Sequence, residues 1–282
     1  MITRRHLRAL LACVGIGALA VGAIFVVQYL AEEPETQALS HDASLDRLVR
    51  GTIVLSLSSA MVILAEGQPG GPLRVESSFD PDVYTLAQRY DESDDGRWTW
   101  RLDFHERSVL HISVIRVWLG RRSPEVTVII PPDLPFDLEA EMKGGCLVMD
   151  FASLDLSSAD VELNRGVVQV SASEPMNVPM KTLTVRGSMG TVLLDRIGNA
   201  SPEKLEVQHR LGAAVVDLQG LWRTDSDIHF HVALADGRLQ VPRDVRVEGL
   251  GQTFIFAPEQ EIALPTLRVG AHASFGDIRV TY

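Results

Sequence analysis

Apolar and polar residues alternate with a period of two along most of the chain after Gly51. Residues 52–57 and 98–104 show the alternation clearly, and Val126, Val128 and Ile130 continue it before two prolines. Side chains two apart on a β-strand point to the same face, so this pattern predicts strands with one buried face. After Gly51 no long segment has the apolar spacing of a helix. The pattern therefore predicts an all-β fold.

A longer unit repeats in the second half of the chain. Two apolar residues at alternate positions are followed, after four residues, by a glycine and then by two more alternating apolar residues. The glycines at this position are Gly145, Gly166, Gly190, Gly212, Gly237 and Gly276. Each glycine would supply a turn with positive φ or close backbone approach. One unit cannot bury its apolar face alone, so the units are expected to form a repeat-built, β-solenoid-like stack of short strands.

The repeat sets the expected domain boundaries. Residues 136–282 would form the β-repeat stack, and residues 51–135 a less regular β region that opens the domain. Residues 55–67 (LSLSSAMVILAEG) also align with residues 154–166 (LDLSSADVELNRG), with eight of thirteen positions identical. This match is either a second echo of the repeat or a low-complexity coincidence.

The N-terminal residues predict a membrane anchor. Residues 9–27 contain no charged side chain, and as a helix extended to Leu30 they would be roughly 33 Å long, enough to cross a bilayer. Arg4, Arg5 and Arg8 precede this segment, and glutamates follow it. The positive-inside rule then gives a single-pass span, residues 9–30, with a cytoplasmic N-terminus. Residues 31–50 would be a linker, and the β domain would lie outside, extracellular or periplasmic.

Two other interpretations of the N-terminus stay open. Residues 18–20 (ALA) resemble a signal-peptidase site, although the apolar run continues through residues 24–27, which favours retention of the segment. Residues 10–13 (LLAC) resemble a lipoprotein box, but it comes early in the apolar run. Cys13 is then a small apolar residue inside the helix.

Charge and cysteine content exclude some classes of function. The 282 residues include 26 Lys and Arg against 37 Asp and Glu, a net charge of −11. Nucleic-acid binding needs a basic patch, so no nucleic-acid partner is expected. The chain's two cysteines cannot build a disulfide framework or a structural zinc site alone. The sequence contains no phosphate-binding loop or dinucleotide fingerprint, and no cofactor is expected.

A pair of histidines is the strongest candidate for metal chemistry. His229 and His231 lie two apart on a predicted strand, so both would leave the same face, and a nearby carboxylate such as Asp225 or Asp227 would have to complete a site. The alternative interpretation, a solvated strand face, is favoured. The two histidines are thus weak metal candidates, and no catalytic or metal-binding residue is assigned.

Other motifs are better explained by structure than by chemistry. Residues 91–96 (DESDDG) resemble the start of an EF-hand loop, but Leu102 stands where a bidentate Glu is needed, so an acidic hairpin turn is expected. Tryptophans could form a sugar-binding platform, with Trp222 exposed in a loop, yet packing in the core or at its rim is the preferred interpretation. No local Ser-His-Asp grouping is present.

Several of these stretches resemble the bacterial toastrack, or adhesin-like, β-repeat family, which includes the C-terminal domain of LiaF-type cell-wall-active-antibiotic response proteins. The resembling residues are IIPPDLP (129–135), LDL (154–156), GNA to LEV (198–207), LQVP (239–242) and SFGDIRV (274–280). The resemblance covers about residues 72–282. It implies a toastrack fold and a non-enzymatic envelope domain in stress sensing, scaffolding or adhesion, and it supplies no functional residues.

The sequence therefore predicts a membrane-anchored, extracytoplasmic, non-enzymatic β-repeat module for adhesion, scaffolding or envelope-stress signalling. An envelope protein or a glycan is the expected partner, and self-association through the C-terminal strand is a further possibility. The alternative is a module that binds a glycan or cell-wall fragment, and a hydrolase assembled from distant loops is less favoured.

Overall fold

The computed structural model describes residues 36–39, 49–107, 123–249, 254–255 and 264–282, all within the compact unit Thr36–Tyr282. These residues form one sheet of fifteen strands and a single 3-10 turn, Ile197–Asn199, which confirms the all-β prediction. Among them there is no helix with the length and apolar composition of a membrane span. The predicted anchor, residues 9–30, lies outside the described residues.

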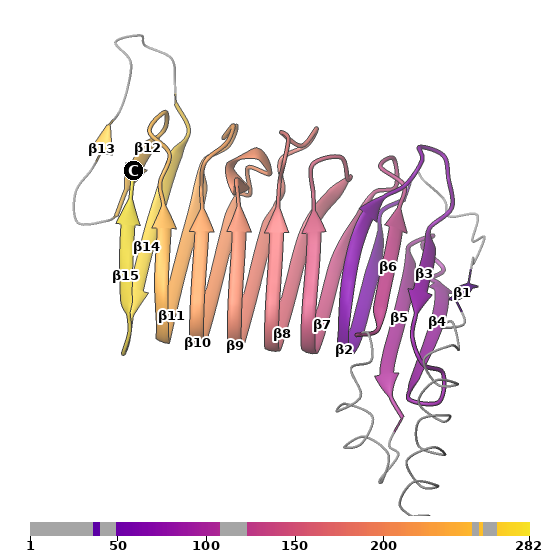
Figure 1. The fold of residues 1–282 in the computed structure, drawn as a ribbon. Helices are drawn as coiled ribbons and strands as arrows, with labels where there is room; N and C mark the ends of the chain where they lie inside the picture. The colour runs from indigo at the N-terminus through magenta and orange to yellow at the C-terminus, as the bar shows by residue number, and fades with distance from the viewer. Residues whose placement is uncertain (1–35, 40–48, 108–122, 250–253, 256–263) are drawn as a thin grey trace, which may run out of the picture. The chain divides into compact units, whose positions relative to one another are not determined.

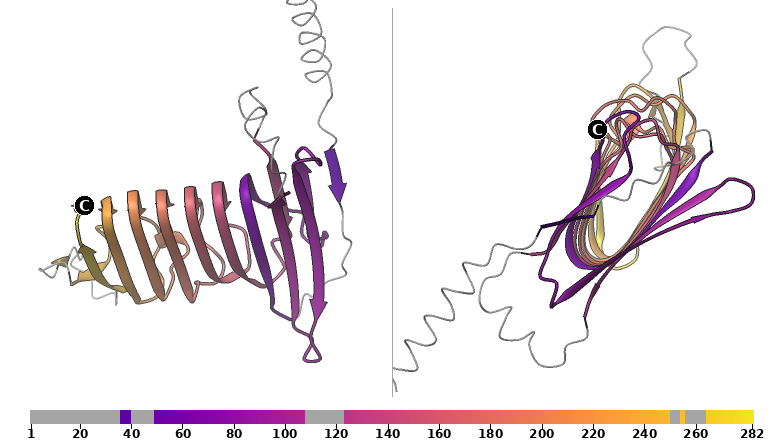
Figure 2. Two further views of the ribbon diagram at one scale, coloured as in Figure 1. Left: turned by 90° about the horizontal axis from the view of Figure 1, so that it is seen from below. Right: turned by 90° about the vertical axis from the view of Figure 1, so that its right-hand side faces the viewer.

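Six long strands form the body of the sheet (Figure 1). Neighbouring strands in this series pair in parallel and nearly in register. Viewed along the series, the strands superpose as nested bends, each running down one flank and returning along the other (Figure 2). They are β2 (Gly51–Glu66), β7 (Phe136–Asp150), β8 (Leu156–Ser171), β9 (Thr182–Asp195), β10 (Lys204–Asp217) and β11 (Ser226–Gln240).

Glycine occupies the bend of four of the six long strands, β7 to β10. Gly145, Gly166, Gly190 and Gly212 have φ of 100°, 122°, 122° and 123°, a region that L-residues with a side chain rarely adopt. They pair in register with one another, so we call this row the glycine ladder. A Cβ added to Gly166, Gly190 or Gly212 would lie 2.0 Å from the carbonyl oxygen of the preceding ladder glycine. On β7 to β10, the positive φ at the bend and the close stacking of the strands therefore both favour glycine over any residue with a side chain.

The ladder departs from the sequence template at one of the six glycines, Gly237. Ala235 pairs with Gly212, whereas Gly237 pairs with Ala214, two residues beyond the ladder. The template therefore aligns the repeat at β11 two residues too late, and the inward pair that precedes the ladder position on β11 is Ile228 and Phe230. Gly276 returns to the ladder, since its Cβ would meet the carbonyl oxygen of Ala235 at 2.1 Å.

Strand β2 belongs to the same parallel series, so the regular stack begins before residue 136. Ala60 pairs with Gly145 and takes the ladder position in β2. Gly67, which the sequence match had aligned with Gly166, lies beyond the end of this strand. The match between residues 55–67 and 154–166 therefore does not reflect structural equivalence, and the coincidence interpretation holds.

Alternating side chains from both flanks fill the interior. On β10, Leu205 and Val207 from the first flank and Ala214 and Val216 from the second are buried, and the same positions are apolar in the neighbouring strands. The change of phase between the two flanks takes place over the exposed residues 210–212. This mostly apolar interior leaves the outward side chains in rows across the stack.

At each end of the series the long strand pairs with two separate strands. The two halves of β2 pair with β5 (Trp98–Glu106) and β6 (Glu125–Ile130). Strand β5 pairs in turn with β4 (Tyr84–Glu92), and β6 pairs with β3 (Arg74–Ser78). Strand β3 also pairs with β1 (Thr36–Leu39), a short strand that lies within the predicted linker, residues 31–50. The two halves of β11 pair with β14 (Thr266–Ala273) and β15 (Asp277–Thr281), and β12 (Arg246–Glu248) joins β14 to β13 (Phe254–Ile255).

Aromatic side chains close the interior beside β2. Trp98, Trp100 and Phe104 are buried on β5, as the alternation predicted, and the Trp98 indole donates to the carbonyl of Val49 at 3.1 Å. The ring of Phe104 packs edge-on against Phe79 and in a stacked arrangement against Tyr84. Residues 93–97 form the turn of the β4–β5 hairpin, with Asp91 and Glu92 at the end of β4, which confirms the interpretation of this acidic stretch as a hairpin turn.

Candidate functional site

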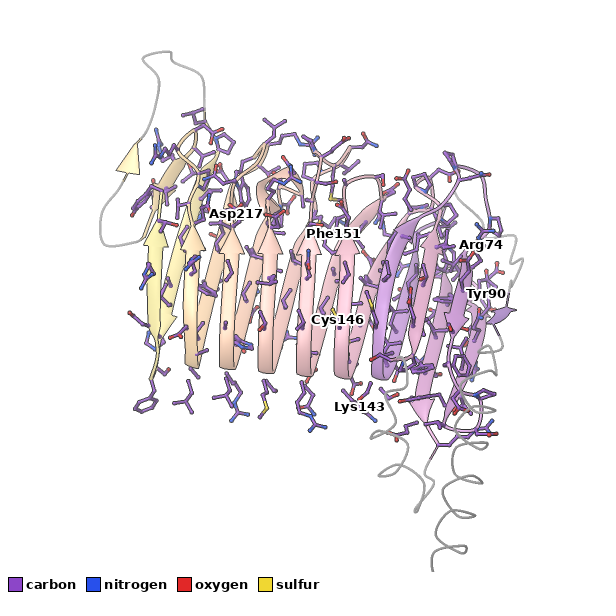
Figure 3. The ribbon with its side chains drawn as sticks, in the orientation of Figure 1. Arg74, Tyr90, Lys143, Cys146, Phe151 and Asp217 are labelled. Atoms are coloured by element: carbon purple, nitrogen blue, oxygen red, sulfur yellow. The ribbon has the colours of Figure 1, made fainter. Side chains whose placement is uncertain are left out.

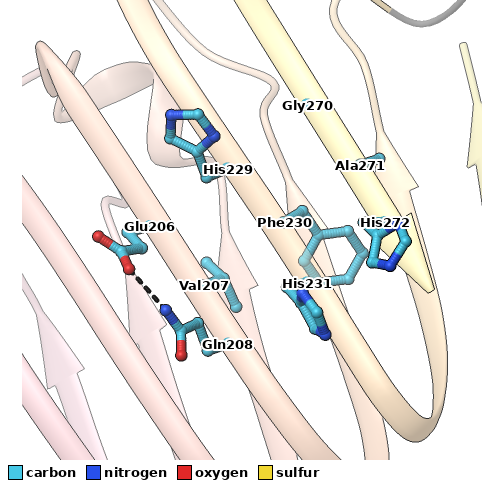
Figure 4. Close-up of a pocket in the computed structure, with 9 residues that line it drawn as sticks. All are labelled: Glu206, Val207, Gln208, His229, Phe230, His231, Gly270, Ala271 and His272. Carbon is cyan, nitrogen blue, oxygen red and sulfur yellow. Dashed lines mark hydrogen bonds between the residues drawn. The ribbon is translucent and has the colours of Figure 1, made fainter. Parts of the chain in front are cut away.

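The strongest candidate site is an open hollow of about 310 Å³ on the outward face of β10, β11 and β14 (Figure 4). Its walls come from two rows of outward positions in register across the three strands. One row is Glu206, His229 and Gly270, and the other is Gln208, His231 and His272. Gly270 carries no side chain beside His229, which leaves the space open. We call this site the histidine hollow.

The imidazoles form one side of the hollow. The rings of His231 and His272 lie with centroids 5.1 Å apart and planes inclined at 57°. The Nε2 atom of His231 is also 3.4 Å from the Ser274 hydroxyl oxygen. His229 and His231 leave the same face of β11, as the sequence predicted. The ring that meets His231, however, is that of His272 on β14, which pairs with β11 but is distant in sequence.

A carboxylate and an amide form the opposite side. The Gln208 Nε2 donates to the Glu206 carboxylate at 2.6 Å, and the Lys204 ammonium lies 3.3 Å from the other carboxylate oxygen. The hydrogen bond from Lys204, followed by that from Gln208, lowers the pKa of Glu206. Glu206 is therefore held ionised near neutral pH. The hollow thus offers fixed hydrogen-bond acceptors and donors beside one another.

The carboxylates considered as partners of the two histidines have other roles. Asp225 accepts the backbone N–H of Thr266 at 2.8 Å, and Asp227 pairs with Arg268, which lowers the pKa of that carboxyl. Within the described ranges no group of three or more His, Cys, Asp and Glu side chains is arranged to hold a metal ion. The metal interpretation of His229 and His231 gains no third ligand from this arrangement.

The tryptophans do not form an exposed platform in the part of the chain that the structure describes. Trp98, Trp100 and Trp222 are all buried, and the Trp222 indole donates to the Leu218 carbonyl at 2.7 Å. A Cβ on Gly198 would meet this indole at 2.6 Å, so the glycine makes room for it. Trp222 is thus packed under its loop instead of exposed in it. Trp118 lies outside the described residues.

His209 is a buried titratable residue away from the hollow. Its ring points into the interior at the bend of β10, with Nε2 3.1 Å from the Gly190 carbonyl oxygen. A Cβ on Gly187 would lie 2.4 Å from its Nδ1, so this glycine leaves room for the ring. Burial lowers the pKa of His209 below its usual value of about 6.5, against the opposing effect of nearby carbonyl groups.

We expect His209 to make stability depend on pH below neutrality. Burial disfavours the protonated ring in the folded chain, whereas the unfolded chain takes up the proton at the ordinary pKa of about 6.5. The contribution of neutral His209 to the free energy of unfolding is therefore fully present above about pH 6.5. It falls as the pH drops from the pKa of the unfolded chain toward the lower pKa of the folded chain. His209→Gln should flatten this part of the curve, measured by urea unfolding at a series of pH values. If the unfolding free energy of His209→Gln keeps the pH dependence of the original chain, that dependence arises from other titratable groups.

The thiol of Cys146 is partly buried at the start of the second flank of β7 (Figure 3). Burial raises its pKa, so the thiolate that would react is disfavoured. The other cysteine, Cys13, lies outside the described residues.

Asp217 lies at the loop edge of β10, and burial raises the pKa of its carboxyl. Its carboxylate accepts the N–H of Gln219 at 2.9 Å, a turn contact that needs no ligand.

Comparisons with known structures identify the fold. A candidate cell adhesion protein from Clostridium sporogenes superposes with a TM-score of 0.57 at 10% identity, over 88% of this chain and 99% of that one. A candidate adhesin from Parabacteroides merdae, 9% identical, aligns over 89% and 98% of the two chains with a TM-score of only 0.24. No protein-family model and no curated protein matches the chain. The first comparison shows a shared all-β fold.

Proposed function

We propose that this chain is a non-enzymatic binding module of the cell envelope, acting in adhesion through the outward face of its stack. The observation that carries this proposal is the register of the long strands, which lines up outward side chains from distant parts of the sequence. The histidine hollow collects its polar groups from two of these strands, β10 and β11, and from β14 beside them. The fold shared with a candidate cell adhesion protein supports the same function.

The chemistry of the hollow favours binding over catalysis. Glu206 is held ionised by Lys204 and Gln208, so it is a poor general acid, and its lowered pKa also makes it a weak base. The same groups are well suited to hydrogen-bonding a polar ligand. We therefore assign the hollow to recognition.

We further propose that residues 9–30 anchor the module in the membrane as a single span with the domain outside. The charge pattern on either side of this segment supports the orientation. A toastrack-type, β-solenoid-like stack agrees with the parallel pairing of the long strands. The resemblance to LiaF-type C-terminal domains supports scaffolding or envelope-stress signalling as related functions of such an anchored module.

A glycan or cell-wall fragment is the second candidate ligand. The hollow favours it because a carboxylate, an amide and imidazoles can bond neighbouring sugar hydroxyls. The burial of Trp98, Trp100 and Trp222 weighs against it, since sugar rings commonly stack on exposed aromatic faces. A protein partner in the envelope is thus preferred.

Binding of the full chain to isolated cell envelopes tests the proposal. The chain is reconstituted in nanodiscs, and its retention by envelope fractions is measured before and after treatment of the envelopes with protease or with glycan hydrolases. Replacing His229, His231 and His272 together by Ala should lower the affinity about tenfold or more, because truncation removes three of the hollow's polar groups. His105→Ala, an exposed histidine on β5, is the matched control.

The treatments separate the two ligands. Loss of binding after protease treatment supports a protein partner, and loss only after glycan hydrolysis assigns the hollow to a glycan. Equal retention of the triple variant and the control would overturn the assignment of the hollow as the binding site.

A further inference from the structure

A row of exposed apolar side chains follows the edge at which the long strands bend. Met189, Leu211 and Leu234 pair in register on β9, β10 and β11, each directly before the ladder position. Phe275 continues the row, since its N–H bonds to the Ala233 carbonyl at 3.0 Å. These four side chains are 46%, 43%, 59% and 82% exposed. We call them the bend-edge ridge.

This exposure is unusual for the stack. Elsewhere on the long strands the large apolar residues alternate inward and are mostly buried. At about 4.8 Å per strand, the ridge runs roughly 14 Å along the edge without a polar residue in its own row. Contiguous exposed apolar side chains of this kind mark interaction surfaces.

Basic residues accompany the ridge. Arg165 occupies the same row on β8, and Lys143 and Arg210 lie one position earlier on their strands, all three exposed. The two positions before the ladder carry no acidic residue on β7 to β11, although the chain as a whole is acidic. Asp236 and Asp277 lie on the other side of the ladder position, on the last two strands. The edge thus combines apolar and cationic groups.

We propose that the bend-edge ridge enters the interfacial layer of an anionic lipid bilayer. Apolar side chains that protrude beside Lys and Arg are what interfacial binding to anionic lipids uses. A protein partner fits less well, because a stable protein interface takes about 20–30 residues a side, whereas the ridge is a single convex file of four. The domain would then contact the membrane directly along this edge.

This inference goes beyond the proposed binding function and does not depend on the histidine hollow. The loop edge, at the far ends of the strands, provides an internal control. Figure 3 shows Lys143 at the bend edge, and Phe151 and Asp217 at the opposite edge. Leu221 lies in the loop after β10 on that opposite edge and is 53% exposed, so it matches the ridge residues in chemistry and exposure.

The depth of a fluorophore at the two edges tests the inference. Phe275→Cys and Leu221→Cys are made in the full chain with Cys13 and Cys146 replaced by Ser, and each is labelled with a polarity-sensitive dye. The proteins are reconstituted in phosphatidylcholine vesicles with and without phosphatidylglycerol, and lipids carrying a quencher are added. We expect quenching at position 275 to exceed that at 221 about threefold, and to rise with the anionic lipid.

A second variant set checks the contribution of the ridge itself. Leu211→Ser with Leu234→Ser should reduce the quenching at position 275 to the level at 221, and both residues are exposed, so the fold should persist. Equal quenching at positions 275 and 221 would overturn the inference. A dye at position 275 that is shielded from water in detergent, without lipid, would also overturn it, since this result would indicate contact between copies of the chain. Co-sedimentation with the vesicles reports separately on the proposed anchor.

Discussion

Gly190→Ala is expected to lower the free energy of unfolding by about 3–5 kcal/mol, among the largest effects of any single substitution in this chain. The φ of Gly190 is 122°, and an added Cβ would lie 2.0 Å from the carbonyl oxygen of Gly166. Backbone strain of this kind costs about 1–3 kcal/mol by itself, and the clash adds to it because the obstructing atom is backbone. Urea unfolding of the full chain in detergent, followed by fluorescence of the buried tryptophans, measures the loss.

Gly270→Ala is the matched control, because it makes the same substitution on a parallel strand without the ladder's geometry. Its Cβ would lie 3.5 Å from the Nδ1 of His229, an ordinary contact, so the change in unfolding free energy should stay within about 0.5 kcal/mol. A change in unfolding free energy for Gly190→Ala as small as that for Gly270→Ala would show that the bend of β9 tolerates a side chain and that glycine is not required there.

Phe151→Ala should cost about 3–5 kcal/mol, since it removes a fully buried ring and leaves a cavity. Phe151 follows β7 at the loop edge (Figure 3). Its N–H donates to the Ser171 carbonyl at 2.9 Å, and its own carbonyl accepts from Leu154 at 3.1 Å. These backbone bonds hold the side chain in place between neighbouring loops. The same urea unfolding assay measures this effect.

Phe275→Ala provides the comparison, because it deletes the same ring where it is 82% exposed. Its effect on unfolding should stay within about 0.5 kcal/mol. A loss at Phe275 that approached the loss at Phe151 would mean that the ridge packs against protein, which would also count against its contact with lipid.

Alternation was sufficient to predict the β structure and much of the core. Residues 98–104 show why: a period of two fixes which side chains share a face, and β6 keeps the same alternation. The glycine template was reliable where the bend needs positive φ, as at Gly166 and Gly190. It failed at Gly237, because Ala235 takes the ladder position there without positive φ, and pattern alone cannot distinguish a glycine at the bend from one beside it.

The candidate site could be predicted only in part. His229 and His231 share one strand, so their common face follows from local spacing. His272 joins them through pairing of β11 with β14, across 41 residues of sequence, and no local pattern specifies that register. The alternation of Ala271 and Ala273 around His272 is the signal in the sequence that could have placed His272 on the outward face, and in the structure the two alanines are half-buried while His272 is exposed. The ridge was missed because Met189 and Leu211 fall between the apolar positions of the template.

The divided ends of the stack determine how the domain would carry mechanical load. Tension between the proposed anchor, which precedes β2, and a ligand at the proposed binding hollow would pass from strand to strand through the backbone hydrogen bonds. Strands β10 and β11 share this load over thirteen residue pairs, whereas β11 and β14 share it over seven. The hollow straddles both junctions. Under force the shorter junction would yield first, releasing the ligand while the longer strands stay paired.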